Sequence, residues 1–155
     1  MSEPYRAFSA VLPIITRKEG GTIQILLHRR QNTGFMDGLL DIAASGHVDE
    51  GETAMQATVR ECKEELGIDV RLEDLTFAHL QHTVRNIGRT YYNISFAISN
   101  FIGVPSISEP DKCTEILWCD INNLPTDMIE SRRAVVQEYA KGSLYSEWVE
   151  NREEQ

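Results

Sequence analysis

Residues 46–68 read GHVDEGETAMQATVRECKEELGI, and this stretch decides how the rest of the chain is interpreted. Its first part, up to Gly51, is a loop with two glycines and two acids, and a helical pattern begins at Thr53. Gly67 stands where a helix would end. Apolar residues recur at spacings of four, three and four, at Met55, Val59, Cys62 and Leu66. This periodicity predicts an amphipathic helix from Thr53 to Leu66.

Three glutamates share another side of the predicted helix. At 100° per residue, Glu61, Glu64 and Glu65 fall within an arc of about 100°, turned away from the apolar stripe. Small side chains extend this side towards the helix start, at Ala54, Ala57 and Thr58. A solvated glutamate face is one interpretation. The other is a divalent cation such as Mg²⁺ or Mn²⁺, because hard carboxylate oxygens suit these ions and a cation offsets the repulsion between like charges.

The spacing of these residues resembles the Nudix box, Gly-x5-Glu-x7-Arg-Glu-U-x-Glu-Glu-x-Gly-U, with U aliphatic. The sequence from Gly46 to Ile68 matches every fixed position, and the one departure is Cys62 at an aliphatic position. Residues 26–38 also look like the segment that enters the box in bacterial Nudix proteins. More loosely, residues 109–125 look like the MutT-related branch that hydrolyses nucleoside triphosphates.

The resemblance implies roles for individual residues. Glu61, Glu64 and Glu65 would be the catalytic metal ligands, and the carbonyl of Ser45 would add a further ligand. One of the three glutamates, or a glutamate elsewhere, would accept a proton from the attacking water. Outside the motif, Glu109 is a lesser candidate for an additional ligand from a distant loop.

Other residues of the motif have implied structural roles. Arg60 and Glu52 would form an ion pair that ties the loop of the box to its helix, and the alternative is that Arg60 contacts phosphate. Gly46 and Gly67 complete the structural part of the motif. Outside it, the phosphate contacts considered are Arg29 and Lys112. The aromatic residues considered for stacking on a base are Tyr91, Tyr92, Phe96 and Trp118.

By resemblance, the protein would be a Mg²⁺-dependent hydrolase that cuts a phosphoanhydride bond of a nucleoside diphosphate derivative. The leading substrate is an ordinary or oxidised nucleoside triphosphate, converted to monophosphate and pyrophosphate. The alternatives are ADP-ribose and dinucleoside polyphosphates. Residues 41–47 also resemble isopentenyl-diphosphate isomerases, but the chain lacks their cysteine ahead of the box. A Nudix domain that only binds nucleotides is a further alternative.

The remaining pattern predicts an α/β fold, and the resemblance implies a Nudix α/β/α sandwich with a mixed β-sheet. We expect one domain over residues 1–155, with a core at about 7–141 and an acidic C-terminal tail that frays from Glu147. Strands are predicted at 7–16, 22–30, 89–98 and 116–120, with Ile23, Ile25 and Leu27 on one face of the second. A Gly20–Gly21 hairpin turn precedes that strand, and caps at 125–127 predict a second helix to Lys141.

Composition and net charge limit the classes of molecule that the protein is expected to bind. The 155 residues carry a formal charge of −9, which argues against binding to nucleic acid or to an anionic membrane. No apolar run reaches the length of a transmembrane helix, and the N-terminus lacks signal-peptide features. Three cysteines without a framework spacing indicate reduced thiols and a cytoplasmic location. The expected partner is a small nucleotide, and a homodimer stays open because similar proteins commonly dimerise.

Overall fold

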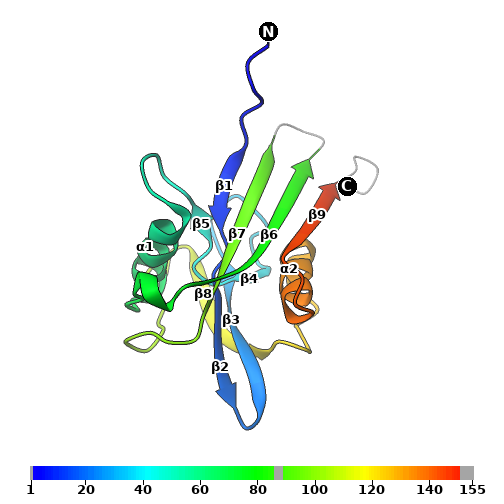
Figure 1. Cartoon of the computed structure of the whole chain (residues 1–155). Coiled ribbons are helices and arrows are strands. Elements are labelled where there is room, and N and C mark those ends of the chain that lie inside the picture. The colour runs from blue at the N-terminus through cyan, green and yellow to red at the C-terminus, as the bar shows by residue number, and fades with distance from the viewer. Residues whose placement is uncertain (1, 86–88, 151–155) are drawn as a thin grey trace.

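In the computed structural model, which describes residues 2–85 and 89–150, a mixed β-sheet lies between two α-helices (Figure 1). The helices are α1 (Ala54–Leu66) and α2 (Glu130–Ala140), and a 3₁₀ turn, η1, spans Leu72–Asp74. The strands are β1 (Phe8–Val11), β2 (Ile14–Glu19), β3 (Thr22–Arg30), β4 (Leu40–Ile42), β5 (Gly46–His47), β6 (Thr76–Arg85), β7 (Thr90–Ile98), β8 (Cys113–Asp120) and β9 (Tyr145–Glu150). The predicted α/β/α sandwich is confirmed.

Two strands, β3 and β7, are the centres of the two halves of the sheet. β3 pairs antiparallel with β2, β4 and β8, whereas β7 pairs antiparallel with β6 and parallel with β1 and β2. β2 belongs to both halves, because Ile14 and Ile15 pair with β7 while Thr16 to Glu19 pair with β3. β5 extends the sheet beside β1, and β9 runs parallel to β6.

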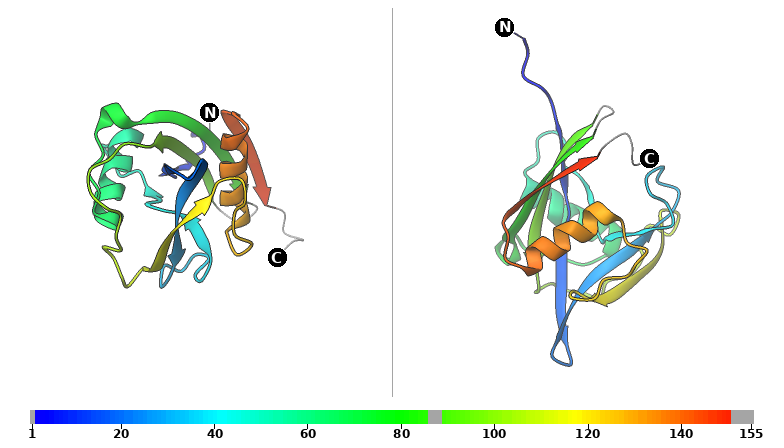
Figure 2. Two further views of the ribbon diagram at one scale, coloured as in Figure 1. Left: turned by 90° about the horizontal axis from the view of Figure 1, so that it is seen from below. Right: turned by 90° about the vertical axis from the view of Figure 1, so that its right-hand side faces the viewer.

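The two faces of the sheet carry separate cores. Ile14, Ile25 and Leu27 pack on the α2 side, whereas Ile15 and Leu26 pack on the α1 side. This division follows from the alternation of side chains along a strand. Figure 2 shows α1 and α2 from two further directions, on opposite sides of the strands.

Ile23, Ile25 and Leu27 alternate along β3 as predicted, but Ile25 and Leu27 are buried, whereas Ile23 is 43% exposed. It lies near the tip of the hairpin formed by β2 and β3, which turns at Gly20 and Gly21 and projects beyond both cores.

Helix α1 begins and ends where the sequence predicted. The Thr53 side chain accepts a hydrogen bond from Gln56 N, and the Gln56 side chain accepts one from Thr53 N, which completes a capping box. Gly67 ends the helix with a left-handed φ of 70°.

The buried side of α1 differs from the prediction. Ala57, Thr58 and Glu61 are buried, while Met55 and Val59 are only partly buried. Small side chains allow the closest approach of the helix to the sheet, and a hydrophobic periodicity gives them little weight. The acidic side of α1 therefore turns partly inward rather than away from the core.

Three other element predictions were wrong at their boundaries. The strand predicted at 7–16 is divided into β1 and β2 at Leu12 and Pro13, because proline has no N–H to donate to a neighbouring strand. The strand predicted at 116–120 begins earlier, at Cys113. Helix α2 begins at Glu130 and is capped at Ile129, beyond the caps predicted at residues 125–127.

The fraying predicted from Glu147 was also wrong. Residues 145–150 form β9, which pairs with β6, and residues 151–155 of the predicted tail lie outside the described residues. Within the described ranges, the helices are too short or too polar to cross a membrane.

Candidate functional site

Glu61 lies on the buried side of α1 and its carboxylate packs against the backbone of Gly46 on β5. Only 8% of the residue is exposed. A Cβ added to Gly46 would lie 2.2 Å from Glu61 Oε1 and 2.3 Å from its Cδ. Glycine at position 46 therefore gives the carboxylate its place beside the loop.

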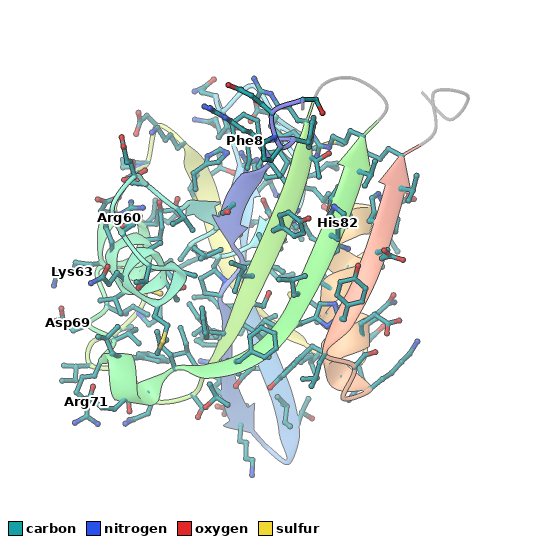
Figure 3. The ribbon with its side chains drawn as sticks, turned by 45° about the horizontal axis from the view of Figure 1, so that its top comes forward. Phe8, Arg60, Lys63, Asp69, Arg71 and His82 are labelled. Carbon is teal, nitrogen blue, oxygen red and sulfur yellow. The ribbon has the colours of Figure 1, made fainter. Side chains whose placement is uncertain are left out.

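Arg60 gathers the loop of residues 46–52 onto α1. Its guanidinium donates to Glu52 Oε1 at 2.7 Å, to Glu52 Oε2 at 3.1 Å and to the carbonyl of His47 at 3.0 Å. The expected ion pair with Glu52 is thus present. Arg60 Nη1 also contacts Glu61 Oε1 at 2.8 Å and Glu64 Oε2 at 3.1 Å. Figure 3 shows Arg60 on the loop side of α1.

The protein compensates the ionised forms of Glu61 and Glu65 poorly. Burial and the nearby carboxylates of Glu61, Glu109 and Asp41 raise the pKa of Glu65 well above its ordinary value. Burial also raises the pKa of Glu61, although Arg60 opposes this shift. Glu64, in contrast, is exposed. Two carboxyl groups held together away from water favour either a bound proton or a nearby cation.

The side chains of the glutamates on α1 are suitable ligands for a hard divalent cation. They present carboxylate oxygens, and the raised pKa values of Glu61 and Glu65 show that a positive charge beside them would be stabilising. Across residues 2–85 and 89–150, however, no three His, Cys, Asp or Glu side chains converge as a ready metal cluster. Arg60 Nη1 bridges Glu61 and Glu64 instead, and so places a cation of the protein between two of the predicted ligands.

Ser45 lies where two cavities meet. The first, which we call the acidic cavity, has a volume of about 290 Å³, and Glu65 and Glu109 contribute its negative charge. Its other lining residues include Ser45, Arg30, Thr33 and Lys112. The preceding residue, Ala44, has a φ of +63°, which is unfavourable for a residue with a Cβ. Strain of this kind is typical of functional loops.

The second cavity, which we call the arginine cavity, has a volume of about 370 Å³ and also reaches Ser45. It is lined by the arginines Arg30, Arg85, Arg89 and Arg132, by the aromatic rings of Phe35, His47 and Tyr91, and by Asp41, Thr83 and Asn93, among others. The cavity therefore combines positive charge with flat side chains, which suits an anionic ligand that carries a planar ring.

The structure brings together some of the predicted site residues and separates others. Arg29 is paired with Glu115 and Asp127, and Lys112 with Glu109. Among the aromatic candidates, Tyr91 lines the arginine cavity. The others lie elsewhere: Tyr92 stacks on His82 of β6 (Figure 3), Phe96 belongs to the core, and Trp118 lies under Arg17.

Sequence reasoning missed most of the arginine cavity. Phe35 was not considered, although its ring lies within 6.0 Å of the guanidinium carbons of Arg30, Arg85 and Arg132. Asn93 was missed as well. These residues come from separate strands, a loop and α2, and no local spacing connects them.

The chain belongs to the NUDIX family, because the model of the NUDIX domain matches residues 6–139. The expected Nudix membership is therefore confirmed. A curated relative, dihydroneopterin triphosphate diphosphatase of Escherichia coli strain K12, is 38% identical over 80 residues. The match covers 52% of this chain and 49% of that relative, so it spans about half of the relative's length.

Solved structures show the same fold at lower identity. A MutT NUDIX hydrolase from Burkholderia pseudomallei superposes with a TM-score of 0.73 at 23% identity, covering 86% of this chain and 98% of that one. A MutT protein from Methanosarcina mazei Go1 gives a TM-score of 0.74 at 19% identity, with 90% and 97% covered. The MutT-like architecture is thus common to these chains.

Proposed function

We propose that the protein is a Mg²⁺-dependent pyrophosphohydrolase that converts a nucleoside triphosphate, ordinary or oxidised, to the monophosphate and pyrophosphate. The observation that carries the proposal is the pair formed by Glu61, which is buried, and Glu65, which is partly buried, because neither carboxylate has a full counter-charge. Membership of the NUDIX family and the triphosphate substrate in the name of the Escherichia coli relative support it.

In this proposal, Glu61, Glu64 and Glu65 hold Mg²⁺, or Mn²⁺ in its place, together with the carbonyl of Ser45. Glu109 is a further ligand, because it lines the acidic cavity together with Glu65 and raises the pKa of that carboxyl group. When bound, the cation neutralises the negative charge of the polyphosphate and lowers the barrier to attack by water. Arg60 and Glu52 hold the loop and α1 together, and Gly46 gives Glu61 room.

The arginine cavity would hold the nucleoside part of the substrate. It is adjacent to the acidic cavity, because Ser45, Arg30 and Thr33 line both. A substrate with its phosphates near Glu65 would therefore place its ring beside these shared residues. Free thiols at Cys62, Cys113 and Cys119 are compatible with the proposed cytoplasmic location.

A substrate panel tests the reaction. Purified protein is incubated with Mg²⁺ and ordinary and oxidised nucleoside triphosphates, dihydroneopterin triphosphate, ADP-ribose, a dinucleoside tetraphosphate and isopentenyl diphosphate. We expect pyrophosphate to be released from one or more of the triphosphates. Activity confined to ADP-ribose or the dinucleoside would reject the triphosphate assignment, and turnover of isopentenyl diphosphate alone would identify an isomerase.

Thermal unfolding provides a readout that does not need turnover. Addition of Mg²⁺ or Mn²⁺ should raise Tm, because a ligand that binds only the folded state stabilises it. Glu65→Gln should reduce the increase, whereas Glu73→Gln, at an exposed position in η1, should not. Tight nucleotide binding without turnover of any panel member would favour a non-catalytic domain.

A further inference from the structure

A line of buried polar side chains runs from α2 across the sheet to the arginine cavity. Gln81 and Thr83 on β6 and Asn93 on β7 are each at most 2% exposed. Gln81 and Asn93 are partners across the two strands, and Gln81 and Thr83 are two residues apart and so share one face. Buried polar groups usually exist in fully paired sets, since an unpaired group destabilises the fold.

Hydrogen bonds fix the direction of every amide in this line. Gln81 Nε2 donates to the carbonyl of Ser131 at 3.0 Å, and a carbonyl can only accept. Gln81 Oε1 therefore faces Thr83, whose hydroxyl donates to it at 3.3 Å. The Thr83 oxygen then accepts from Asn93 Nδ2 at 3.1 Å. A flipped Asn93 amide would place two acceptors against one hydroxyl that is already committed.

The line ends in an acceptor without a donor. Asn93 Oδ1 is buried and receives no hydrogen bond from any residue that the structure describes. Asn93 and Thr83 both line the arginine cavity. The carboxylate of Asp41, also in this cavity, is already bonded to Arg30, Arg132 and the Ile42 N–H. Asn93 Oδ1 is thus an uncommitted acceptor, in contrast to the carboxylate of Asp41 beside it.

We propose that Asn93 determines substrate specificity by accepting a hydrogen bond through Oδ1 from an N–H group on the heterocyclic ring of the nucleotide. Thr83 and Gln81 are positioning residues that hold Oδ1 towards the cavity. The inference rests on the proposed function, because it places the nucleoside in the arginine cavity. Flat groups there suit the ring, since the Arg85 guanidinium carbon lies 4.9 Å from the Phe35 centroid and 5.8 Å from that of Tyr91.

The requirement for an N–H group follows from the energetics of the pair. Asn93 Oδ1 is shielded, so neighbouring side chains have to move slightly for a ring to reach it. A ring with an N–H group gains a hydrogen bond at this point, whereas a ring with a methyl group or a lone pair there leaves the acceptor unpaired. Sites built around such an acceptor reject ligands that lack the donor more strongly than apolar pockets reject a change of size.

Metal-free calorimetry tests the proposal apart from catalysis. The probes are the guanosine, adenosine, uridine and cytidine 5′-monophosphates, each paired with the analogue in which methyl groups replace the N–H hydrogens of its base-pairing edge. For the base that binds best, wild-type protein should prefer the parent by about tenfold in Kd. In Asn93→Leu the preference should fall below about twofold, whereas the exposed Asn123→Leu control should keep it.

The positioning role has its own variants. Thr83→Val removes the hydroxyl that orients the amide and should reduce the preference by about threefold. Thr83→Ser restores a hydroxyl and should restore the preference, which a purely structural loss would not explain. Circular dichroism confirms that each variant is folded.

The outcomes separate this inference from the proposed function. Equal binding of parent and methylated nucleotides to wild type, failure of every parent to bind, or a retained preference in Asn93→Leu would overturn the assignment of Asn93. Discrimination between the nucleotides by a protein that releases no pyrophosphate would instead reject the hydrolase and leave Asn93 as the acceptor.

Discussion

Asp41 on β4 is buried and Glu65 on α1 is partly buried, and the two acids differ in the charges that surround them. Burial would raise the pKa of Asp41, but Arg132, His28 and Arg30 outweigh it and the pKa is lowered. Around Glu65, burial and other carboxylates act in the same direction and raise the pKa. An acid whose charge is matched by the fold holds structure together, whereas one whose charge is unmatched is suited to bind an external cation.

The largest expected effect is on kcat, which should fall when a glutamate on α1 is neutralised. Glu64→Gln and Glu65→Gln should each lower kcat with Mg²⁺ by about a thousandfold, because a bound cation supplies several kcal/mol of charge stabilisation. Glu65→Gln should leave Tm unchanged or higher, since it removes a poorly compensated charge. Steady-state kinetics and thermal unfolding measure both quantities. Full rates in both variants would show that the ligand assignment is wrong.

The matching change at Asp41 should act on stability instead. Asp41→Asn leaves Arg30 and Arg132 without their buried partner and should lower the free energy of unfolding by about 3 kcal/mol. The pKa of Asp41 is lower in the folded protein than its ordinary value of 3.8, so the ionised carboxylate stabilises the fold at pH values above 3.8. This stabilisation is lost as the pH falls through the pKa of the folded state. Urea unfolding between pH 7 and 3 should therefore show a weaker acid dependence in Asp41→Asn. An unchanged acid dependence would contradict the structural role.

The smallest expected effect is on stability, and it comes from the partial compensation of the Glu61 charge by Arg60. Arg60→Met removes the guanidinium bonds to Glu52 and Glu61 and should lower the free energy of unfolding by about 2 kcal/mol. Arg71→Met is the control, because the Arg71 side chain is exposed where it pairs with Asp74, which also accepts a hydrogen bond from Asn100, and the loss should be within about 0.5 kcal/mol of wild type. Equal losses in the two variants would show that Arg60 is no more than a surface cation.

The sequence allowed α1 and its acids to be predicted because the signals are local. The apolar spacing from Met55 to Leu66, the glutamate spacing and Gly67 all lie in the helix or directly beside it. The inward rotation of Glu61 could not be predicted in this way, because it depends on the space that Gly46 leaves on a separate strand.

Other predictions were wrong because the elements concerned depend on pairing between residues that are distant in the sequence. Helix α2 begins late because Leu40 on β4 takes Asp127 and Ile129 into backbone hydrogen bonds, which holds these residues extended. β9 forms because β6 offers it a partner about 65 residues away in the chain. The arginine cavity depends in the same way on contacts between distant segments, and a single sequence carries no signal for them.

Membership of β2 in both halves of the sheet limits where the chain can change length. Because Ile14 faces one core and Ile15 the other, deletion of a single residue in β2 would exchange the two sides and expose apolar groups to the wrong neighbours. The hairpin tip at Gly20 and Gly21 lies outside both cores, so a change of length there exchanges no buried side chains. Insertions are therefore expected to be accepted at this tip and refused within the strand that joins the two halves.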